Sequence, residues 1–469
     1  MFTNLVKTIG EQFKEIEDRR QPGKVSYSMN DCLMGGLACM YFKDPSLLEF
    51  QRRFEKKTER SNLQTMFGVE KTPQDSQFRN ILDEIDPSEI ESAFPRLFAI
   101  LDNSKVLERY RFIDGKYLLD VDGTGTFSSD KIHCDSCLTQ KVVKETKKSR
   151  AKKGGNKKKT SEENGGEVAG TVMPEAAREE EVSVRFNHKM IHGVLVHPGI
   201  KEVLPFVTEA IRNGDGKEKQ DCEIKAGKRL LAKIRKDHPK LPLIFNGDGL
   251  FSKVPFVKEL QERRMSFIIV AKETDHPHLY EELEGRRKLG EVTRIILRDA
   301  KKRKHIYEIC LGLPLRDETK TKEEELLVNW FSYELINEKG KRGYFNTWVT
   351  DLEPKRETVE ELVRGGRARW KAENETFNTL KNGGYHMEHN YGHGEKNLSY
   401  NFVLLILLAF LVHQIQRLAD WQYQQAREKR GPFYALAEMM RVLFRIVAWP
   451  SYEAMMNTVI AGELTLAPS

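Results

Sequence analysis

The spacing of apolar residues in the first quarter of the chain is helical. In residues 29–57 and 86–110, apolar side chains recur every three or four positions, which is the spacing of one helix face. Asp44-Pro45-Ser46 precedes the stretch LLEFQRRF, and Asp86-Pro87-Ser88 opens the second region. An acid followed by proline is a typical helix start. We therefore predict a helical N-terminal domain over residues 1–110.

From residue 111 the pattern changes to short apolar strands that alternate with amphipathic helices. Three strands come first, followed by a helix, a strand, a helix and a strand, and this order predicts an α/β sheet in residues 111–275. The expected strands cover 116–122, 182–197, 201–208, 241–249 and 266–271, and the expected helices cover 219–237 and 251–264. A His-Pro-Gly turn joins the second and third strands.

Residues 276–355 are predicted to form a β-rich insertion. Four β-like segments separated by charged turns lie between Leu289 and Leu352, and we expect them to be all β. Residues 356–469 return to helical spacing. Their most apolar run, residues 402–412, is 11 residues long. A membrane span needs about 20 residues, so this run predicts a buried core helix and no membrane partner.

Charge is distributed unevenly along the 469 residues. The 77 Lys and Arg exceed the 70 Asp and Glu, and the net charge of +7 suits a polyanionic partner without requiring one. Residues 139–181 are extreme, with a Lys- and Arg-rich half followed by an acidic, Gly-rich half. Such a composition predicts a flexible charged loop, which could hold nucleic acid loosely or could be a tolerated surface insertion.

Six cysteines in a chain of this length do not form a disulfide framework, and the mixed, charged N-terminus does not resemble a signal peptide. We therefore expect a cytoplasmic protein. Cys134 and Cys137 form half of a zinc-site pattern, but a fourth ligand such as His188 or Cys222 is not evident from the spacing, and ordinary buried thiols are the expectation. Three further histidines stand among Gly and Asn residues, which indicates a loop rather than a metal site: His386, His389 and His393.

Three carboxylates stand at positions where an α/β sheet places its active site. Asp122 ends the first strand beside Asp120, Asp248 follows a later strand in a Gly-Asp-Gly context, and Glu373 lies four residues after Arg369 in a stretch without Gly or Pro. Three carboxylates in a small volume repel each other unless divalent cations balance them, and oxygen ligands suit Mg²⁺ or Mn²⁺. Two such ions can drive an in-line phosphoryl transfer.

These motifs resemble those of DDE transposases of bacterial insertion sequences, in the group with a β-strand insertion between the second Asp and the Glu. LLDVDGT matches the first-acid motif, IFNGDGLFS the second and RARWKAENETFNTLK the third. The resemblance implies an RNase H-like mixed sheet with helices on both faces, interrupted by an all-β insertion and preceded by the helical N-terminal domain. It assigns catalysis and metal binding to Asp122, Asp248 and Glu373.

The resemblance also implies a mechanism and partners. A metal-activated water would cut one strand at the transposon end, and the freed 3′-hydroxyl would attack the opposite strand or target DNA, with two Mg²⁺ or Mn²⁺ ions. Arg369 and Lys381 would hold phosphates, and Trp348 would stack on a flipped base in a hairpin intermediate. The N-terminal domain would contact double-stranded DNA, and the protein would act as a homodimer assembled on that DNA, in association with the nucleoid.

Two positions depart from the family signature Tyr-x2-Arg-x3-Glu-x6-Lys. The Tyr would fall at Gly366, and Lys381 lies one residue beyond the expected spacing, so Glu375 is the fallback for Glu373. Two other functions fit the same acids: an RNase H-like metal-dependent nuclease without strand transfer, and a DNA-binding relative that has lost catalysis.

Overall fold

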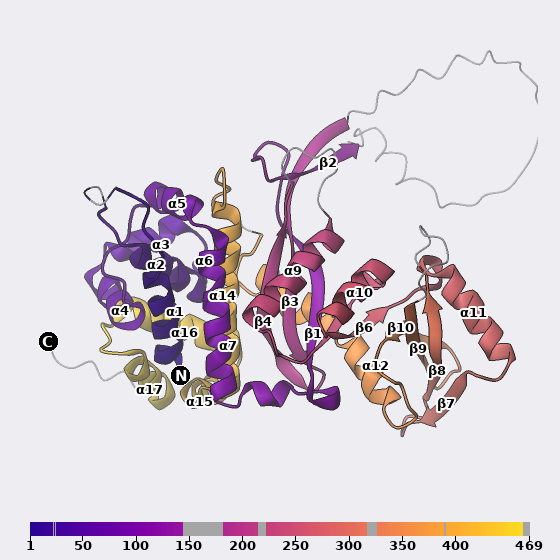
Figure 1. Ribbon diagram of the computed structural model, residues 1–469. Helices are drawn as coiled ribbons and strands as arrows, with labels where there is room; N and C mark the ends of the chain where they lie inside the picture. The colour runs from indigo at the N-terminus through magenta and orange to yellow at the C-terminus, as the bar shows by residue number, and fades with distance from the viewer. Residues whose placement is uncertain are drawn as a thin grey trace, which may run out of the picture.

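The computed structural model describes residues 1–143, 182–213, 222–316, 326–388 and 391–462, apart from Pro22 and Lys24 (Figure 1). Most of the predicted charged loop at 139–181 lies outside these residues. The described start of that loop belongs to a strand, β2 (Leu138–Val143), which pairs with β3.

A ten-stranded mixed sheet forms the centre of the molecule. Strands β1 (Tyr117–Ser129), β3 (Val182–His197) and β4 (Ile200–Ile211) pair antiparallel, whereas β5 (Leu243–Gly247) and β6 (Ser266–Val270) run parallel to β1. Residues 117–121 of β1 are all buried, as expected for a central strand covered on both faces. The resulting order β4–β3–β1–β5–β6 confirms the expected RNase H-like sheet.

Helices predicted between the strands pack against this sheet. Helix α9 (Glu223–Asp237) covers β3 and β4, α10 (Val254–Glu262) packs on β6, and both lie in front of the strands in Figure 1. Helix α12 (Val359–Arg367) also contacts β6. Strand β1 continues to Ser129, beyond Asp122, where the sequence pattern predicted its end, and the middle of the strand lies beside the chain that follows α12.

The predicted β insertion extends the same sheet. Its strands are β7 (Thr293–Arg298), β8 (Lys304–Leu315), β9 (Leu326–Ile336) and β10 (Arg342–Thr350). Strand β10 pairs antiparallel with β6, so the order continues as β6–β10–β9–β8–β7. Helix α11 (Pro277–Lys288), which the hydrophobic pattern did not predict, packs on β8.

The predicted N-terminal domain and the C-terminal helices form one helical body (Figure 1). Its N-terminal helices are α1 (Phe2–Lys14), α2 (Met29–Tyr41), α3 (Leu47–Phe54), α4 (Lys57–Phe67), α5 (Asp75–Glu84), α6 (Pro87–Glu91) and α7 (Ala93–Asn103). Its C-terminal helices are α14 (Leu398–Ala419), α15 (Trp421–Arg430), α16 (Phe433–Ile446) and α17 (Tyr452–Ala461). The two ends of the described chain meet there, since the Phe2 and Tyr452 rings stack with centroids 3.8 Å apart.

Helix α14 is the core of the helical body. By length and composition its 22 residues could cross a membrane, but 89% of its most apolar window is buried inside the protein, which confirms the predicted core helix. It stands between the N-terminal helices and β4. Helix α2 approaches it closely at Gly36, where an added Cβ would lie 2.8 Å from Leu405.

Candidate active site

Asp122 lies on β1 at the edge of the buried part of the strand. Its carboxylate accepts a hydrogen bond from the Gly123 backbone N–H at 2.9 Å and lies 3.3 Å from the guanidinium of Arg369. Burial raises the pKa of Asp122, the Arg369 charge opposes this rise, and the nearby charges of Asp248 and Glu373 add to it. The three predicted acids are therefore close enough to interact electrostatically.

Asp248 directly follows β5, the parallel neighbour of β1. Because parallel strands bring their carboxyl ends to the same edge of a sheet, this position places Asp248 on the side of Asp122. Its carboxylate caps the short 3₁₀ helix Gly249–Phe251 by accepting the Leu250 N–H at 3.0 Å. This hydrogen bond holds the side chain in a defined orientation.

Glu373 lies in a π-helical turn rather than in the continuous helix that the sequence predicts. The turn, Ala372–Phe377, separates α12 from α13 (Asn378–Asn382) and leaves Glu373 exposed while Phe377 is buried. Arg369 pairs with Asp122 at this site. The fallback residue Glu375 instead faces Lys371, whose pKa is lowered by burial and partly restored by that carboxylate.

The π turn also explains the displaced lysine. The backbone N–H of Asn378 donates to the carbonyl of Glu373, five residues earlier, whereas an α-helix would use a residue four earlier. One extra residue is thus absorbed between Glu373 and Lys381. Lys381 therefore lies on the same helix face, relative to Glu373, as a lysine at x6 spacing would in a regular α-helix. Its ammonium group lies 2.8 Å from the carboxylate of Glu388.

Trp348 does not fit the predicted role in base stacking. Its side chain is 0% exposed, and its ring stacks on Phe331 with a centroid distance of 5.2 Å. A Cβ added at Gly366 would lie 2.6 Å from the indole nitrogen, so the indole occupies the space beside the position where the family signature has Tyr. With no ring face open to DNA, Trp348 is a core residue that fills this space.

Glu223 is a fourth acid at the site, which the sequence analysis missed. It lies in the first turn of α9, and an added Cβ at Gly123 would be 2.9 Å from its carboxylate. Burial raises the pKa of Glu223, and the charges of Asp248 and Asp122 raise it further. No motif marks this residue, because only folding brings the start of α9 beside Gly123 of β1.

The donor set fits divalent cations that prefer oxygen ligands. Asp122, Asp248, Glu373 and Glu223 offer carboxylate oxygens only, which suit Mg²⁺ or Mn²⁺ better than zinc. Within the described residues, these oxygens are not gathered within 4.8 Å of one another. Asp120 is excluded as a ligand because it is fully buried; burial raises its pKa to about 8, although Asn246 donates to it at 2.7 Å.

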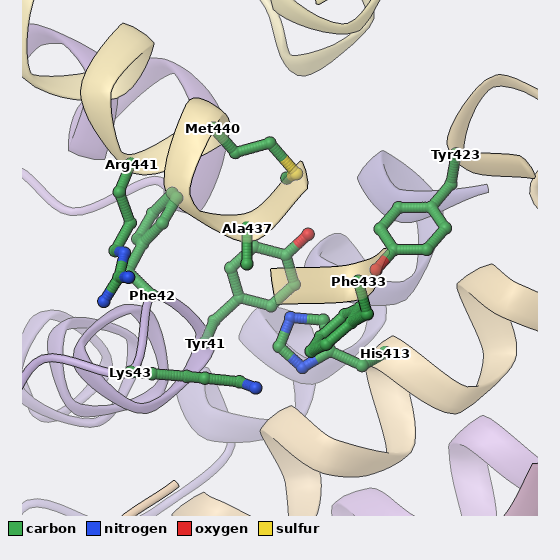
Figure 2. A pocket seen from close by; sticks show the side chains of 9 residues that line it. All are labelled: Tyr41, Phe42, Lys43, His413, Tyr423, Phe433, Ala437, Met440 and Arg441. Carbon is green, nitrogen blue, oxygen red and sulfur yellow. The ribbon is translucent and has the colours of Figure 1, made fainter. Parts of the chain in front are cut away.

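A second pocket lies in the helical body and lacks this chemistry. Figure 2 shows Lys43 pointing among the rings of Tyr41, His413 and Phe433. The ammonium group donates to the Gly383 carbonyl at 2.8 Å and lies 4.3 Å from the Phe433 ring centroid. Its lining contains no carboxylate, so we assign this pocket to packing.

Two family models match the chain. A model described as Transposase DDE domain matches residues 218–411, which include Asp248 and Glu373, and a model described as DDE_Tnp_1-associated matches residues 10–97. The first match begins after β4, so Asp122 lies outside it. No curated protein matches the chain.

Proposed function

The chain belongs to the DDE transposase family, and from this premise we propose that it cuts insertion-sequence ends and joins them to target DNA through Asp122, Asp248 and Glu373. The observation that carries the proposal is the convergence of the three acids. Arg369, four residues before Glu373, lies 3.3 Å from the carboxylate of Asp122, and Asp248 follows the strand that pairs in parallel with β1. Asp122 lies within β1, Asp248 directly follows β5 and Glu373 lies in the turn after α12, and the charges of Asp248 and Glu373 add to the rise in the pKa of Asp122.

The carboxylates would hold two Mg²⁺ or Mn²⁺ ions, which would supply activation of the attacking water or 3′-hydroxyl and stabilisation of the leaving oxygen. The protein supplies the positions of the ligands. The backbone N–H groups of Gly123 and Leu250 fix the carboxylates of Asp122 and Asp248, and the π turn presents Glu373 to solvent.

Two cations, Arg369 before Glu373 and Lys381 after it, would bind the DNA backbone. Arg369 has a planar guanidinium that can exchange the carboxylate of Asp122 for a phosphate, and Lys381 offers a point charge. For an aromatic contact we now favour Trp370, which adjoins Arg369 and is 45% exposed. Double-stranded DNA is the partner, and we propose that two copies of the chain assemble on it in the bacterial cytoplasm.

A cleavage and joining assay tests this proposal. Labelled duplexes that carry the element's end are incubated with Mg²⁺ and a target duplex. We expect Asp122→Asn, Asp248→Asn and Glu373→Gln each to abolish cleavage, with a loss of at least about 10³-fold, while gel-shift binding persists. Glu375→Gln is the matched control and should cut at nearly the wild-type rate.

The outcomes separate the alternatives. Wild-type cleavage without any joined product would identify a nuclease rather than a transposase, and binding without cleavage would identify an inactive relative. Activity of Glu373→Gln together with loss in Glu375→Gln would show that the third acid is misassigned.

A further inference from the structure

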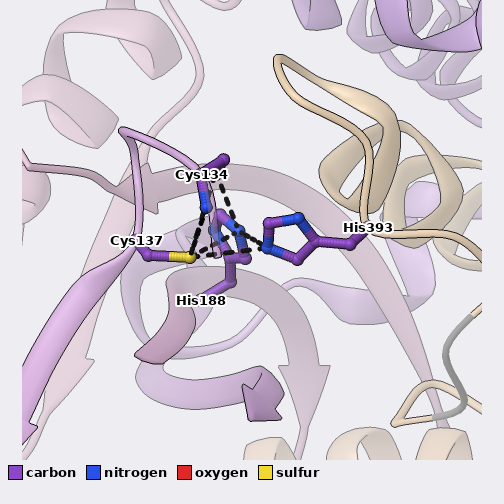
Figure 3. Close-up of side chains that lie close together, drawn as sticks. All are labelled: Cys134, Cys137, His188 and His393. Carbon is purple, nitrogen blue, oxygen red and sulfur yellow. Dashed lines mark hydrogen bonds between the residues drawn. The ribbon is translucent and has the colours of Figure 1, made fainter. Parts of the chain in front are cut away.

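Four metal-binding side chains from distant parts of the sequence converge beside the sheet (Figure 3). Cys134 and Cys137 lie in the loop between β1 and β2, and His188 lies on β3. His393 comes from the loop between α13 and α14. The two cysteines are therefore not isolated buried thiols, as the sequence led us to expect. His393, which its Gly-rich context assigned to a plain loop, brings its Nε2 atom to 3.4 Å from Cys137 Sγ. His389 lies outside the described residues.

The distances between the four ligand atoms are short and similar. Cys134 Sγ lies 3.9 Å from Cys137 Sγ and 3.6 Å from His188 Nε2. Cys137 Sγ lies 3.4 Å from the Nε2 atoms of both histidines, and these two nitrogens are 3.0 Å apart. All four atoms lie within 4.8 Å of one another.

These separations match a tetrahedral zinc site. With bonds of about 2.3 Å to sulfur and about 2.0 Å to nitrogen, tetrahedral geometry puts neighbouring ligands about 3.3–3.8 Å apart. A disulfide does not account for the cluster, because its sulfurs would be about 2.05 Å apart. Two thiolates and two imidazoles are a ligand set typical of structural zinc.

Hydrogen bonds to the backbone orient two of the four side chains, His393 and Cys137. His393 Nδ1 donates to the Gly394 carbonyl at 2.8 Å, so the neutral ring carries its lone pair on Nε2, which faces the cluster. The Cys134 backbone N–H points to Cys137 Sγ at 3.5 Å, and the Cys137 N–H donates to the Cys134 carbonyl at 3.1 Å. The loop is thus folded back on itself with both sulfurs on one side.

Two of the four ligands are buried, and Cys134 and His188 are half-buried. Cys137 is 2% exposed and His393 is 8% exposed. The Phe127 ring packs 4.5 Å from the His393 ring. Four protein ligands fill a tetrahedral shell and leave no position for substrate, so the site suits a structural role rather than catalysis.

We propose that Cys134, Cys137, His188 and His393 bind one Zn²⁺ ion, which fastens the loop between α13 and α14 to the β1–β2 loop and to β3, the strand that pairs with β1. Asp83 of α5 strengthens the same segment, because its carboxylate accepts the backbone N–H groups of residues 395–398. Such an ion and Asp83 together would connect the β1–β2 loop and β3 with the His393 loop and α5.

Metal analysis of the full-length protein tests the site without DNA. Purified wild type should contain about one zinc per chain, and Cys137→Ser and His393→Asn should lose it. The controls Cys222→Ser and His278→Asn change exposed side chains outside the cluster and should keep full zinc content. Asp122→Asn should also keep it, which separates this site from the proposed active site.

Cobalt substitution reports the ligands even where a variant is less stable. Co²⁺ in the wild type should show thiolate charge-transfer absorption and the intense visible bands of tetrahedral coordination. Cys134→His should keep the visible bands and lose about half of the charge-transfer intensity, since one of two thiolates is removed. The proposal would be overturned if wild-type protein contained no zinc and also gave an octahedral Co²⁺ spectrum. A Cys134–Cys137 disulfide, detected by mass spectrometry in the purified wild type, would overturn it as well.

Discussion

At the residue scale, Glu223 adds a negative charge to the candidate active site. Its carboxylate lies against Gly123, and it shares the site with Asp122 and Asp248. Removing one negative charge from this group weakens the attraction for cations. The interaction of two unit charges about 4 Å apart in a water-like medium is about 1 kcal/mol, which corresponds to about a fivefold change in affinity.

Glu223→Gln is therefore expected to raise the Mg²⁺ concentration for half-maximal cleavage by about fivefold. The cleavage rate at saturating Mg²⁺ should change less, because the three predicted ligands remain. Glu262→Gln, an exposed change of the same type on α10, is the control. A Mg²⁺ titration measures the effect, and identical midpoints for Glu223→Gln and wild type would exclude a role for Glu223 in cation binding.

Lys43 carries a second electrostatic prediction at the residue scale. Burial, together with the nearby charges of Arg417 and Arg441, lowers its pKa from 10.5 to about 7. The ammonium form is thus disfavoured in the folded protein. Because the folded pKa is below the unfolded pKa, this group contributes stability that is present above about pH 10.5 and is lost as the pH falls toward 7.

Lys43→Met should remove this dependence, since methionine has no charge to bury. The unfolding free energy of the variant minus that of the wild type should increase by on the order of 1–3 kcal/mol when the pH is lowered from about 10 to about 6. The positive φ of 55° at this residue strains both proteins alike. Denaturant melts at the two pH values measure the difference, with exposed Lys240→Met as control; a pH-independent difference would contradict the buried-lysine interpretation.

At the element scale, the π turn shows what the sequence pattern could and could not predict. The extra residue before Lys381 is visible in the sequence as a departure from a signature. A helical pattern does not reveal where the backbone absorbs it, because the choice of a π turn depends on tertiary packing of Phe377 and Leu380. Most strand positions, by contrast, followed from apolar runs between turn residues, since β5 and β6 are buried throughout most of their length.

Deleting Asn374 tests the role of the π turn. Asn374 is exposed, and its deletion would convert the π turn into a regular α-helix. In that helix Phe377, Leu380 and Lys381 would keep their present orientation relative to Glu373. We expect this variant to fold and to cut DNA within about tenfold of wild type. Inserting Ala after Asn374 should instead rotate Lys381 by about 100° and turn buried residues outward, with loss of cleavage and of stability. Equal activity of the two variants would show that the register does not matter.

At the scale of the whole molecule, the helical body joins parts of the chain that the sequence analysis assigned to separate domains. The amphipathic spacing identified the helices of residues 1–110, but it could not predict that their partner is α14, since apolar faces do not specify what covers them. The contacts are specific in the structure. Asn401 of α14 donates to the carbonyls of Leu82 and Ile85, and Tyr41 donates to Gln416 at 3.0 Å.

The sequence predicts only part of the cluster of Cys134, Cys137, His188 and His393, for a related reason. Cys134 and Cys137 were recognised as half of a site, but His188 lies beyond the long charged segment and His393 lies near the other end of the chain. Ligand spacing identifies a metal site only when the ligands are close in sequence. Here the sheet pairing of β1 with β3 and the packing of the His393 loop bring them together.

Removing residues 1–104 should prevent the remainder from folding independently. The truncation exposes Phe402 and Leu405 of α14 and leaves the buried Asn401 amide without its acceptors. Each large apolar side chain contributes about 1.5–3 kcal/mol on burial, so exposing several of them on α14 removes an amount comparable with a typical total stability of about 5–15 kcal/mol. We expect the fragment 105–469 to aggregate and to lack a cooperative thermal transition.

Co-expression of residues 1–104 as a separate chain provides the control, because the interface with α14 is non-covalent. The two pieces should copurify and recover a cooperative transition near that of the intact protein. A monodisperse fragment 105–469 that melts cooperatively at the wild-type temperature would instead show that the N-terminal helices form a detachable domain, as the sequence boundaries first suggested. The contacts of α14 with α2 and α5 on one side and with β4 on the other favour the single body, since this helix cannot be covered by the sheet alone.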